Sequence, residues 1–181
     1  ASPCYEQVGT DAGNGWQRQA NGGRWGTDWP SRAQAAVVYI FVNDFKEATY
    51  FIRGTDSKDA LLEGRYRYTM RFEKDQLPPV DRARGGFWSL TMYDKDYFMV
   101  PAANARHNIG SVNLDAEELQ FAEDGSLTIV ISSGEPTDSA GKANWLPAPA
   151  DQFALIVRTY VPDQAILEGA YQLPNVVRQA P

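Results

Sequence analysis

Residues 65–72 alternate strictly between polar and apolar side chains. The apolar set is Tyr66, Tyr68, Met70 and Phe72, and the polar set is Arg65, Arg67, Thr69 and Arg71. Neighbouring side chains of a β-strand point to opposite faces, so the pattern predicts a strand with one core face and one arginine-rich face. That second face suits either solvent, with local acidic partners, or an anionic ligand, because guanidinium groups bind carboxylates and phosphates.

Short apolar runs separated by turn residues continue along the rest of the chain. The strands predicted from them are 48–53, 86–94, 119–121, 126–132 and 152–160. Asp124-Gly125 separates the third of these from the fourth and predicts a tight hairpin. Short strands spaced by about 10 to 25 residues predict a two-sheet sandwich or a barrel rather than a parallel sheet.

The N-terminal part has a different pattern. Residues 1–30 are rich in Gly, Asn, Gln and Trp, which predicts an irregular arm that lays aromatic side chains on the body. Pro30 and Ser31 are typical of a helix start, so we expect a helix over 31–43, although the following valines favour a strand. The expected organisation is an arm (1–30), a helical segment (31–46) and one β domain (47–181).

The length and the net charge of the chain exclude several classes of function. A chain of 181 residues fits one domain that buries enough surface to fold without a metal or disulfide. Lys plus Arg is 17 and Asp plus Glu is 23, which gives a net charge of −6. That sign argues against nucleic acid and anionic membrane surfaces as partners. We also expect no membrane span, because the sequence lacks a run of about 18 apolar residues.

The scarcity of cysteine and histidine excludes several classes of metal site and internal disulfides. The chain has one cysteine, Cys4, and one histidine, His107. Structural zinc sites, iron–sulfur clusters, internal disulfides and iron sites that need two histidines are therefore excluded, and we expect neither a metal nor a cofactor. His107 is the single candidate imidazole base, but the nucleophile elbow Gly-x-Ser-x-Gly is missing. A hydrogen-bonded structural histidine is the simpler interpretation.

Several ordered motifs carry a resemblance to a known family. They include Phe87-Trp88-Ser89-Leu90-Thr91-Met92-Tyr93-Asp94, Asp124-Gly125-Ser126-Leu127-Thr128-Ile129, Asn144-Trp145-Leu146-Pro147-Ala148-Pro149 and Arg158-Thr159-Tyr160. Together with Gly26-Thr27-Asp28 and Arg67-Tyr68-Thr69, they resemble the family called domain of unknown function 1214. The resemblance covers roughly residues 24–178.

The resemblance implies a fold and a setting. It implies a mainly β, jelly-roll-like antiparallel β-sandwich with a short N-terminal helical segment, and it favours the helix at 31–43. In that family the domain usually follows a partner domain, domain of unknown function 1254, and export signals are frequent, which favours an exported protein. This sequence departs from the family pattern after Arg106, where His107, Asn108 and Ser111 stand in place of an aromatic residue, a serine and an acid.

Two functional hypotheses follow. The first is a metal-independent enzyme for a small organic or carboxylated molecule, with catalytic residues Arg67, Tyr68, Arg106 and His107. The residues expected to bind its ligand, or to line its pocket, are Trp88, Tyr93, Asn104, Trp145 and Arg158. The second hypothesis is a non-catalytic binding or assembly module. Such a module would recognise carbohydrate, or pack against identical copies or a partner domain of the 1254 type.

Overall fold

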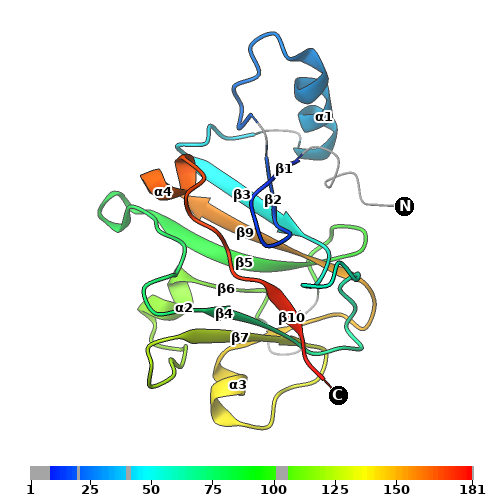
Figure 1. Cartoon of the computed structure of the whole chain (residues 1–181), viewed down its shortest axis with the longest axis vertical. Helices are drawn as coiled ribbons and strands as arrows, with labels where there is room; N and C mark the ends of the chain where they lie inside the picture. Colours follow the sequence, from blue (N-terminus) through cyan, green and yellow to red (C-terminus); the bar gives the residue numbers. More distant parts are fainter. Residues whose placement is uncertain (1–8, 20, 40–41, 101–105, 181) are drawn as a thin grey trace.

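The structure, a computed structural model, describes residues 9–19, 21–39, 42–100 and 106–180. Within these ranges the chain forms ten strands in two sheets that face each other (Figure 1). The mainly β sandwich is therefore confirmed. The chain crosses between the sheets repeatedly, so the strands of each sheet come from distant parts of the sequence.

The larger sheet carries six strands in the order β1-β2-β3-β9-β5-β6, and each pair in it is antiparallel. Their bounds are β1 (Gly9–Asp11), β2 (Gln17–Gln19), β3 (Ala48–Arg53), β9 (Phe153–Tyr160), β5 (Phe87–Asp94) and β6 (Asn108–Gly110). The long apolar strand β9 lies between β3 and β5, where both of its edges are hydrogen-bonded. This central position fixes which residues of β3 and β5 stand beside each residue of β9.

The smaller sheet has the order β10-β4-β7-β8. Its strands are β10 (Val176–Arg178), β4 (Tyr68–Phe72), β7 (Leu127–Ser132) and β8 (Trp145–Pro147). The alternation predicted for residues 65–72 is present in β4, where Tyr68, Met70 and Phe72 are buried and Arg71 is exposed. The pair β7–β8 is parallel, which departs from the expected all-antiparallel sandwich.

Short helices lie in the connections between the strands. They are α1 (Trp29–Tyr39), the 3₁₀ turn η2 (Arg82–Arg84), α2 (Ser111–Asp115), α3 (Ser139–Ala143) and α4 (Gln164–Leu167). The Asp28 carboxylate accepts the Ser31 N–H at the start of α1, which caps the helix, so it begins two residues earlier than predicted. Helix α1 ends before residue 43 and lies beyond the β1–β2 edge of the larger sheet (Figure 1).

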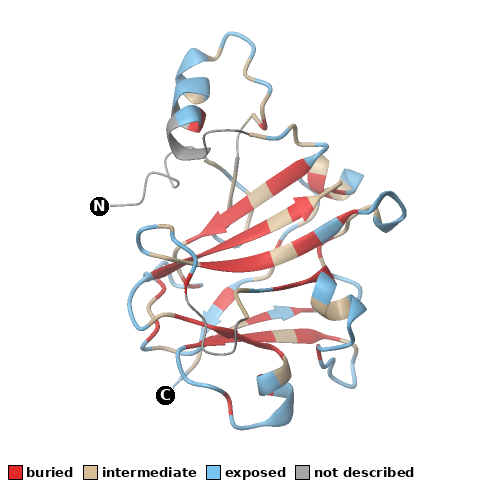
Figure 2. Ribbon diagram, turned by 180° about the vertical axis from the view of Figure 1, so that it is seen from behind, coloured by how far each residue is buried: buried red, intermediate tan, exposed pale blue. Residues whose placement is uncertain are grey.

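The core fills the space between the sheets. Inward-facing residues of β4, β5 and β9 belong to this core, and Figure 2 shows long buried stretches, in red, along the strands of both sheets. Trp16 joins this core from the N-terminal segment and is fully buried, with its indole N–H donating to Pro174 O. The segment predicted as an irregular arm thus contains strands β1 and β2 and a core residue.

The hairpin strand predicted at 119–121 does not form. Ala122 and Ser126 close the expected turn, with a hydrogen bond of 2.9 Å from Ala122 N to Ser126 O. The backbone N–H and C=O of Gln120, however, bond to the Asn144 side chain instead of a strand. Both edges of β7 are already occupied by β4 and β8, so no edge remains for residues 119–121.

No helix in the described part of the chain combines the length and the apolarity that crossing a bilayer requires.

Candidate functional site

The outer face of the larger sheet holds a cluster of one arginine and three tyrosines. Arg158 of β9 stands between Tyr50 of β3 and Ser89 of β5, and Tyr160 of β9 stands beside Phe87 of β5. Leu155, Val157 and Thr159 of β9 are fully buried on the other face, so the half-buried Arg158 and Tyr160 face outward. We call Tyr50, Tyr93, Arg158 and Tyr160 the Arg–Tyr cluster.

Arg158 and Tyr93 contact each other directly. The Arg158 Nη2 donates to the Tyr93 hydroxyl oxygen at 2.5 Å, and its guanidinium carbon lies 5.3 Å from the centre of the Tyr93 ring. Within the described ranges, no carboxylate forms an ion pair with Arg158. Since a phenol oxygen is a neutral acceptor, the cluster keeps a net positive charge on an otherwise acidic protein.

Tyr50 completes the cluster across the β3–β9 pair. Its hydroxyl accepts a hydrogen bond from Asn43 Nδ2 at 2.8 Å. Burial, followed by the adjacent Tyr160, raises the pKa of the Tyr50 phenol. The phenol therefore stays protonated at all physiological pH values.

The cluster combines a charged donor with neutral donors and flat apolar rings. Phe87 is 38% exposed and stacks on Tyr160, with ring centres 4.4 Å apart and an angle of 16° between the rings. A guanidinium offers several N–H donors in one plane, and a carboxylate or carbonyl oxygen is its natural partner. Chemically, the arrangement suits an anionic or carbonyl group attached to a flat organic body.

Of the residues expected to bind ligand, two meet in this cluster: Tyr93 and Arg158. Trp88 is 3% exposed and packs in the core, with its ring centre 5.8 Å from that of Phe72. Trp145 faces outward from the smaller sheet, but it is 6% exposed and its indole N–H donates to Ser132 O. Asn104 lies outside the described residues.

The four residues expected to act in catalysis do not converge. Tyr68 is fully buried, and its hydroxyl accepts the Glu63 backbone N–H at 3.0 Å. Arg106 donates to Ala143 O at 2.5 Å, lies near Trp145 O and pairs with Glu118 at 3.3 Å, so it covers carbonyls at the end of α3 and the start of β8. His107 Nδ1 lies 2.9 Å from Val100 O. Arg67 lines a groove on the smaller sheet, on the opposite side of the sandwich from Arg158.

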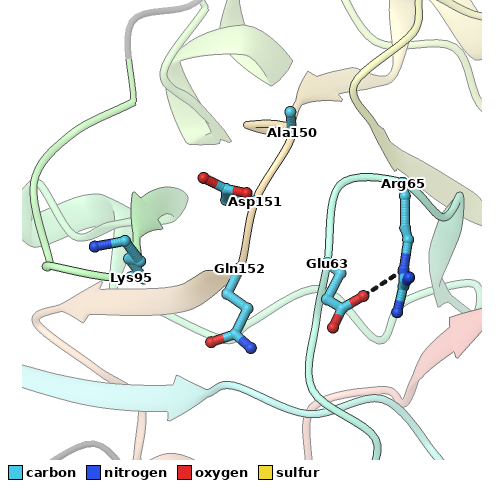
Figure 3. Close-up of a pocket in the computed structure, with 6 residues that line it drawn as sticks. All are labelled: Glu63, Arg65, Lys95, Ala150, Asp151 and Gln152. Carbon is cyan, nitrogen blue, oxygen red and sulfur yellow. Dashed lines mark ion pairs between the residues drawn. The ribbon is translucent and has the colours of Figure 1, made fainter.

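A separate hollow of about 480 Å³ lies where residues 63–65 meet residues 150–152. We call it the charged hollow. It is lined by Glu63, Arg65, Lys95, Ala150, Asp151 and Gln152, and Figure 3 shows Arg65 and Lys95 on opposite sides of it. Both cations already have carboxylate partners: Arg65 pairs with Glu63 at 2.5 Å and Lys95 with Asp96 at 2.6 Å. The charged hollow therefore offers an anion less than the Arg–Tyr cluster does.

Comparison with known proteins assigns the family. The model of the family described as protein of unknown function (DUF1214) matches residues 47–164, which is more than half of the chain. The chain belongs to the DUF1214 family. The matched range contains all four residues of the Arg–Tyr cluster and excludes β1, β2 and β10. No curated protein matches the chain.

Two solved structures resemble this DUF1214 chain. The VPA0106 protein from Vibrio parahaemolyticus is 30% identical, with a TM-score of 0.65 over 83% of this chain. A putative uncharacterized protein from Burkholderia cenocepacia is 19% identical, with a TM-score of 0.40, and the match covers 73% of this chain and 29% of that one. The chain spans 35% of the length of the Vibrio protein.

Sequence reasoning missed Tyr50 and Tyr160 as site residues. Each occupies a strand that the apolar pattern predicts correctly, and each points outward because the strand alternates. Tyr160 lies in the motif Arg158-Thr159-Tyr160, so spacing by two residues is a usable signal that it shares a face with Arg158. For Tyr50, the signal is the pairing of β3 with β9, which the sequence does not specify.

Proposed function

We propose that this DUF1214 chain binds a small, flat organic molecule that carries a carboxylate, and that the carboxylate binds at the Arg–Tyr cluster. The observation that carries the proposal is the direct contact between Arg158 and the neutral Tyr93, where an acidic partner is otherwise usual. A ligand carboxylate supplies the charge that the pair lacks. Charge-assisted hydrogen bonds of this kind contribute about 1.5 to 3 kcal/mol each.

The surrounding rings support the choice of a flat ligand. Tyr50 and Tyr160 flank Arg158 on the same face, and Phe87 extends the aromatic surface. Aromatic side chains bind flat groups through offset or stacked contacts, and their hydroxyls donate to polar substituents. The ligand then lies over the rings with its carboxylate directed at Arg158.

The proposal is tested with benzoate and benzamide as probes. Both are flat and of equal size, but only benzoate carries a charge. In ¹⁵N NMR titrations of the full chain, benzoate should shift resonances of β3, β5 and β9, and Arg158→Gln should weaken its binding by about tenfold, the value of one lost charged hydrogen bond. Tyr93→Phe should weaken it less.

Arg71→Gln is the matched control, because Arg71 is exposed on the other sheet and pairs with Glu73 and Asp124. It should leave benzoate binding unchanged. Equal shifts by benzoate and benzamide, or equal losses in Arg158→Gln and Arg71→Gln, would disprove recognition of a carboxylate at the cluster.

Catalysis at the same cluster is the second candidate. Arg158 donates to the Tyr93 oxygen, which leaves the phenolic hydrogen free to point at a ligand oxygen, the geometry of a proton donor. In this version the catalytic residues are Tyr93 and Arg158, in place of the expected Tyr68 and Arg67. The discriminating experiment incubates the chain with a panel of aromatic esters and carbonyl compounds. Turnover that Tyr93→Phe abolishes, with binding retained, supports an enzyme.

Assembly with a further domain is compatible with either activity. The Vibrio protein is longer than this chain, which covers 35% of it, and the extra length supports a partner domain such as the 1254 type. Light scattering on the purified chain tests the alternative, in which the chain assembles with identical copies of itself. A monomer at all concentrations argues against self-assembly.

A further inference from the structure

A groove of about 280 Å³ crosses the outer face of the smaller sheet, opposite the Arg–Tyr cluster. Strands β4 and β7 form its floor, and α3 and residues 120–122 form its walls. The residues that matter here are Arg67, Thr69, Gln120, Phe121, Thr128 and Asn144. The acidic residue of the lining, Asp138, caps α3, where its carboxylate accepts the Gly141 N–H at 2.6 Å. The volume lies just below the ~300 to 1,000 Å³ of typical ligand sites, so the groove suits about one ring of a larger ligand.

Arg67 differs from the arginines beside it on the same alternating segment. Arg65 pairs with Glu63, and Arg71 pairs with both Glu73 and Asp124. For the Arg67 guanidinium, residues 9–19, 21–39, 42–100 and 106–180 provide neither an ion pair nor a hydrogen bond. Its donors are thus available to an acidic group in the groove.

The groove also presents neutral hydrogen-bonding groups. Thr69 Oγ1 accepts from Gln179 Nε2 at 2.7 Å, which leaves the Thr69 hydroxyl hydrogen to donate. Thr128 stands on the neighbouring strand, two register positions from Thr69. Hydroxyl groups that both donate and accept match the hydroxyls of a sugar.

The walls of the groove are held in place. Buried Asn144 accepts from Gln120 N at 2.9 Å and donates to Gln120 O at 2.7 Å, which fixes residues 120–122 against α3. Phe121 follows directly and is 49% exposed, so its ring lies at the rim of the groove. An exposed ring at a fixed position gives the apolar face of a sugar a surface to pack on.

From this combination we infer that the groove is a second binding site, specific for an acidic sugar of the uronic acid type. Arg67 binds the carboxylate, Thr69 and Thr128 bind ring hydroxyls, and Phe121 packs on the apolar face of the ring. The inference is independent of the proposed function, because it uses the opposite side of the sandwich and none of the residues of the Arg–Tyr cluster.

The test is an NMR titration of the full chain with α-1,4-linked digalacturonate and with the neutral galactobiose of the same linkage. Digalacturonate should shift resonances of β4, α3 and residues 120–122. Arg67→Gln should weaken its binding by about tenfold, as expected for one charged hydrogen bond. Galactobiose should bind about as weakly to the wild type as digalacturonate binds to Arg67→Gln.

Two control variants distinguish binding in the groove from a general effect of positive charge. Arg71→Gln removes an equal charge from the same alternating segment (residues 65–72), at a residue that does not line the groove, and should change the affinity by less than about twofold. Arg158→Gln alters the Arg–Tyr cluster and should have no effect on digalacturonate. Phe121→Ser tests the stacking contact and should weaken both sugars. The inference is overturned if digalacturonate causes no groove shifts up to about 10 mM, or if Arg71→Gln and Arg67→Gln weaken it equally.

Discussion

The arginine residues of this chain lie in chemically different surroundings. Their neighbours in the sequence do not predict these differences. Arg53 is 2% exposed and donates to Thr55 O and Asp56 O, while Gly15 packs against its guanidinium. Burial lowers the pKa of Arg53, and the carboxylates of Asp59 and Asp56 oppose that effect. Arg53 also donates to Asn175 Oδ1 at 3.4 Å and thus joins three segments of the chain, whereas Arg158 and Arg67 have no carboxylate partner among the described residues.

Tyr171 makes the stability of the protein sensitive to alkali. Its hydroxyl donates to Gln76 O at 2.9 Å, and burial raises its pKa well above the ordinary value. Above pH 10 the unfolded chain releases this proton and the folded chain keeps it, so the free energy of unfolding falls as pH rises, by about 1.4 kcal/mol per pH unit for this residue. Tyr171→Phe should make that decline shallower by the same amount in urea unfolding series.

The same series contains its own control. Below pH 9 both forms keep the proton, so the variant and the wild type should differ only by the lost hydrogen bond, about 1 kcal/mol. Parallel declines above pH 10 would show that Tyr171 ionises as easily in the folded chain as in the unfolded one.

At this scale the sequence predicts part of the site. Tyr93 and Arg158 are predictable because each lies in a motif, but their contact depends on the β5–β9 register, which places Tyr93 opposite Ala154. Arg106 is also expected at the site, yet it donates to the backbone carbonyl of Ala143 and lies near that of Trp145. Residue type indicates the chemistry of each side chain, and pairing between distant strands decides its partner.

At the scale of elements, the contact between residues 63–64 and 149–151 depends on a glycine. A Cβ on Gly64 would lie 1.5 Å from Pro149 O, and Gly64 N donates to Asp151 O at 3.0 Å. Gly64→Ala must therefore separate two backbones and should lower the free energy of unfolding by about 3 kcal/mol, near the upper end for overpacking. Urea unfolding followed by tryptophan fluorescence measures the loss.

Gly134→Ala is the control for this change. An added Cβ at Gly134 meets nothing within 4 Å, so the variant should stay within about 0.5 kcal/mol of the wild type. A Gly64→Ala protein as stable as Gly134→Ala would mean that the two segments move apart without cost.

Elements are predictable where the chain has several apolar positions in a row. The apolar runs at β3, β5, β7 and β9 predict strands within one residue of the observed bounds. Strands β1, β2 and β10 have three residues each. A segment this short cannot show a recognisable alternation of polar and apolar residues. They exist because a neighbouring strand offers a free edge, and this depends on the rest of the fold.

At the scale of the whole molecule, the range that the family model matches leaves out part of the hydrophobic core. Residues 47–164 omit Trp16, Leu173 and Val176, all of them fully buried core residues. A fragment of residues 47–164 would expose their partners, and loss of one such large side chain costs about 3 to 5 kcal/mol. The fragment should show no cooperative thermal transition by circular dichroism and should bind a hydrophobic dye, whereas the full chain should unfold cooperatively.

A fragment that melts at the temperature of the full chain would contradict this prediction. It would show that the outer segments add strands without supporting the core.

Two segments near the ends of the described chain, residues 14–16 and 173–174, contact each other, and this contact affects how the protein folds during synthesis. Trp16 donates to Pro174 O, and Asn14 donates to Leu173 O. Residue 16 leaves the ribosome long before residue 174 is synthesised. Trp16 therefore lacks its hydrogen-bond acceptor, Pro174 O, during nearly all of synthesis. Contacts of such sequence separation also slow folding, because a long loop must close first. During translation the nascent chain therefore presents an exposed indole, and chaperones gain the longest time to act on that segment.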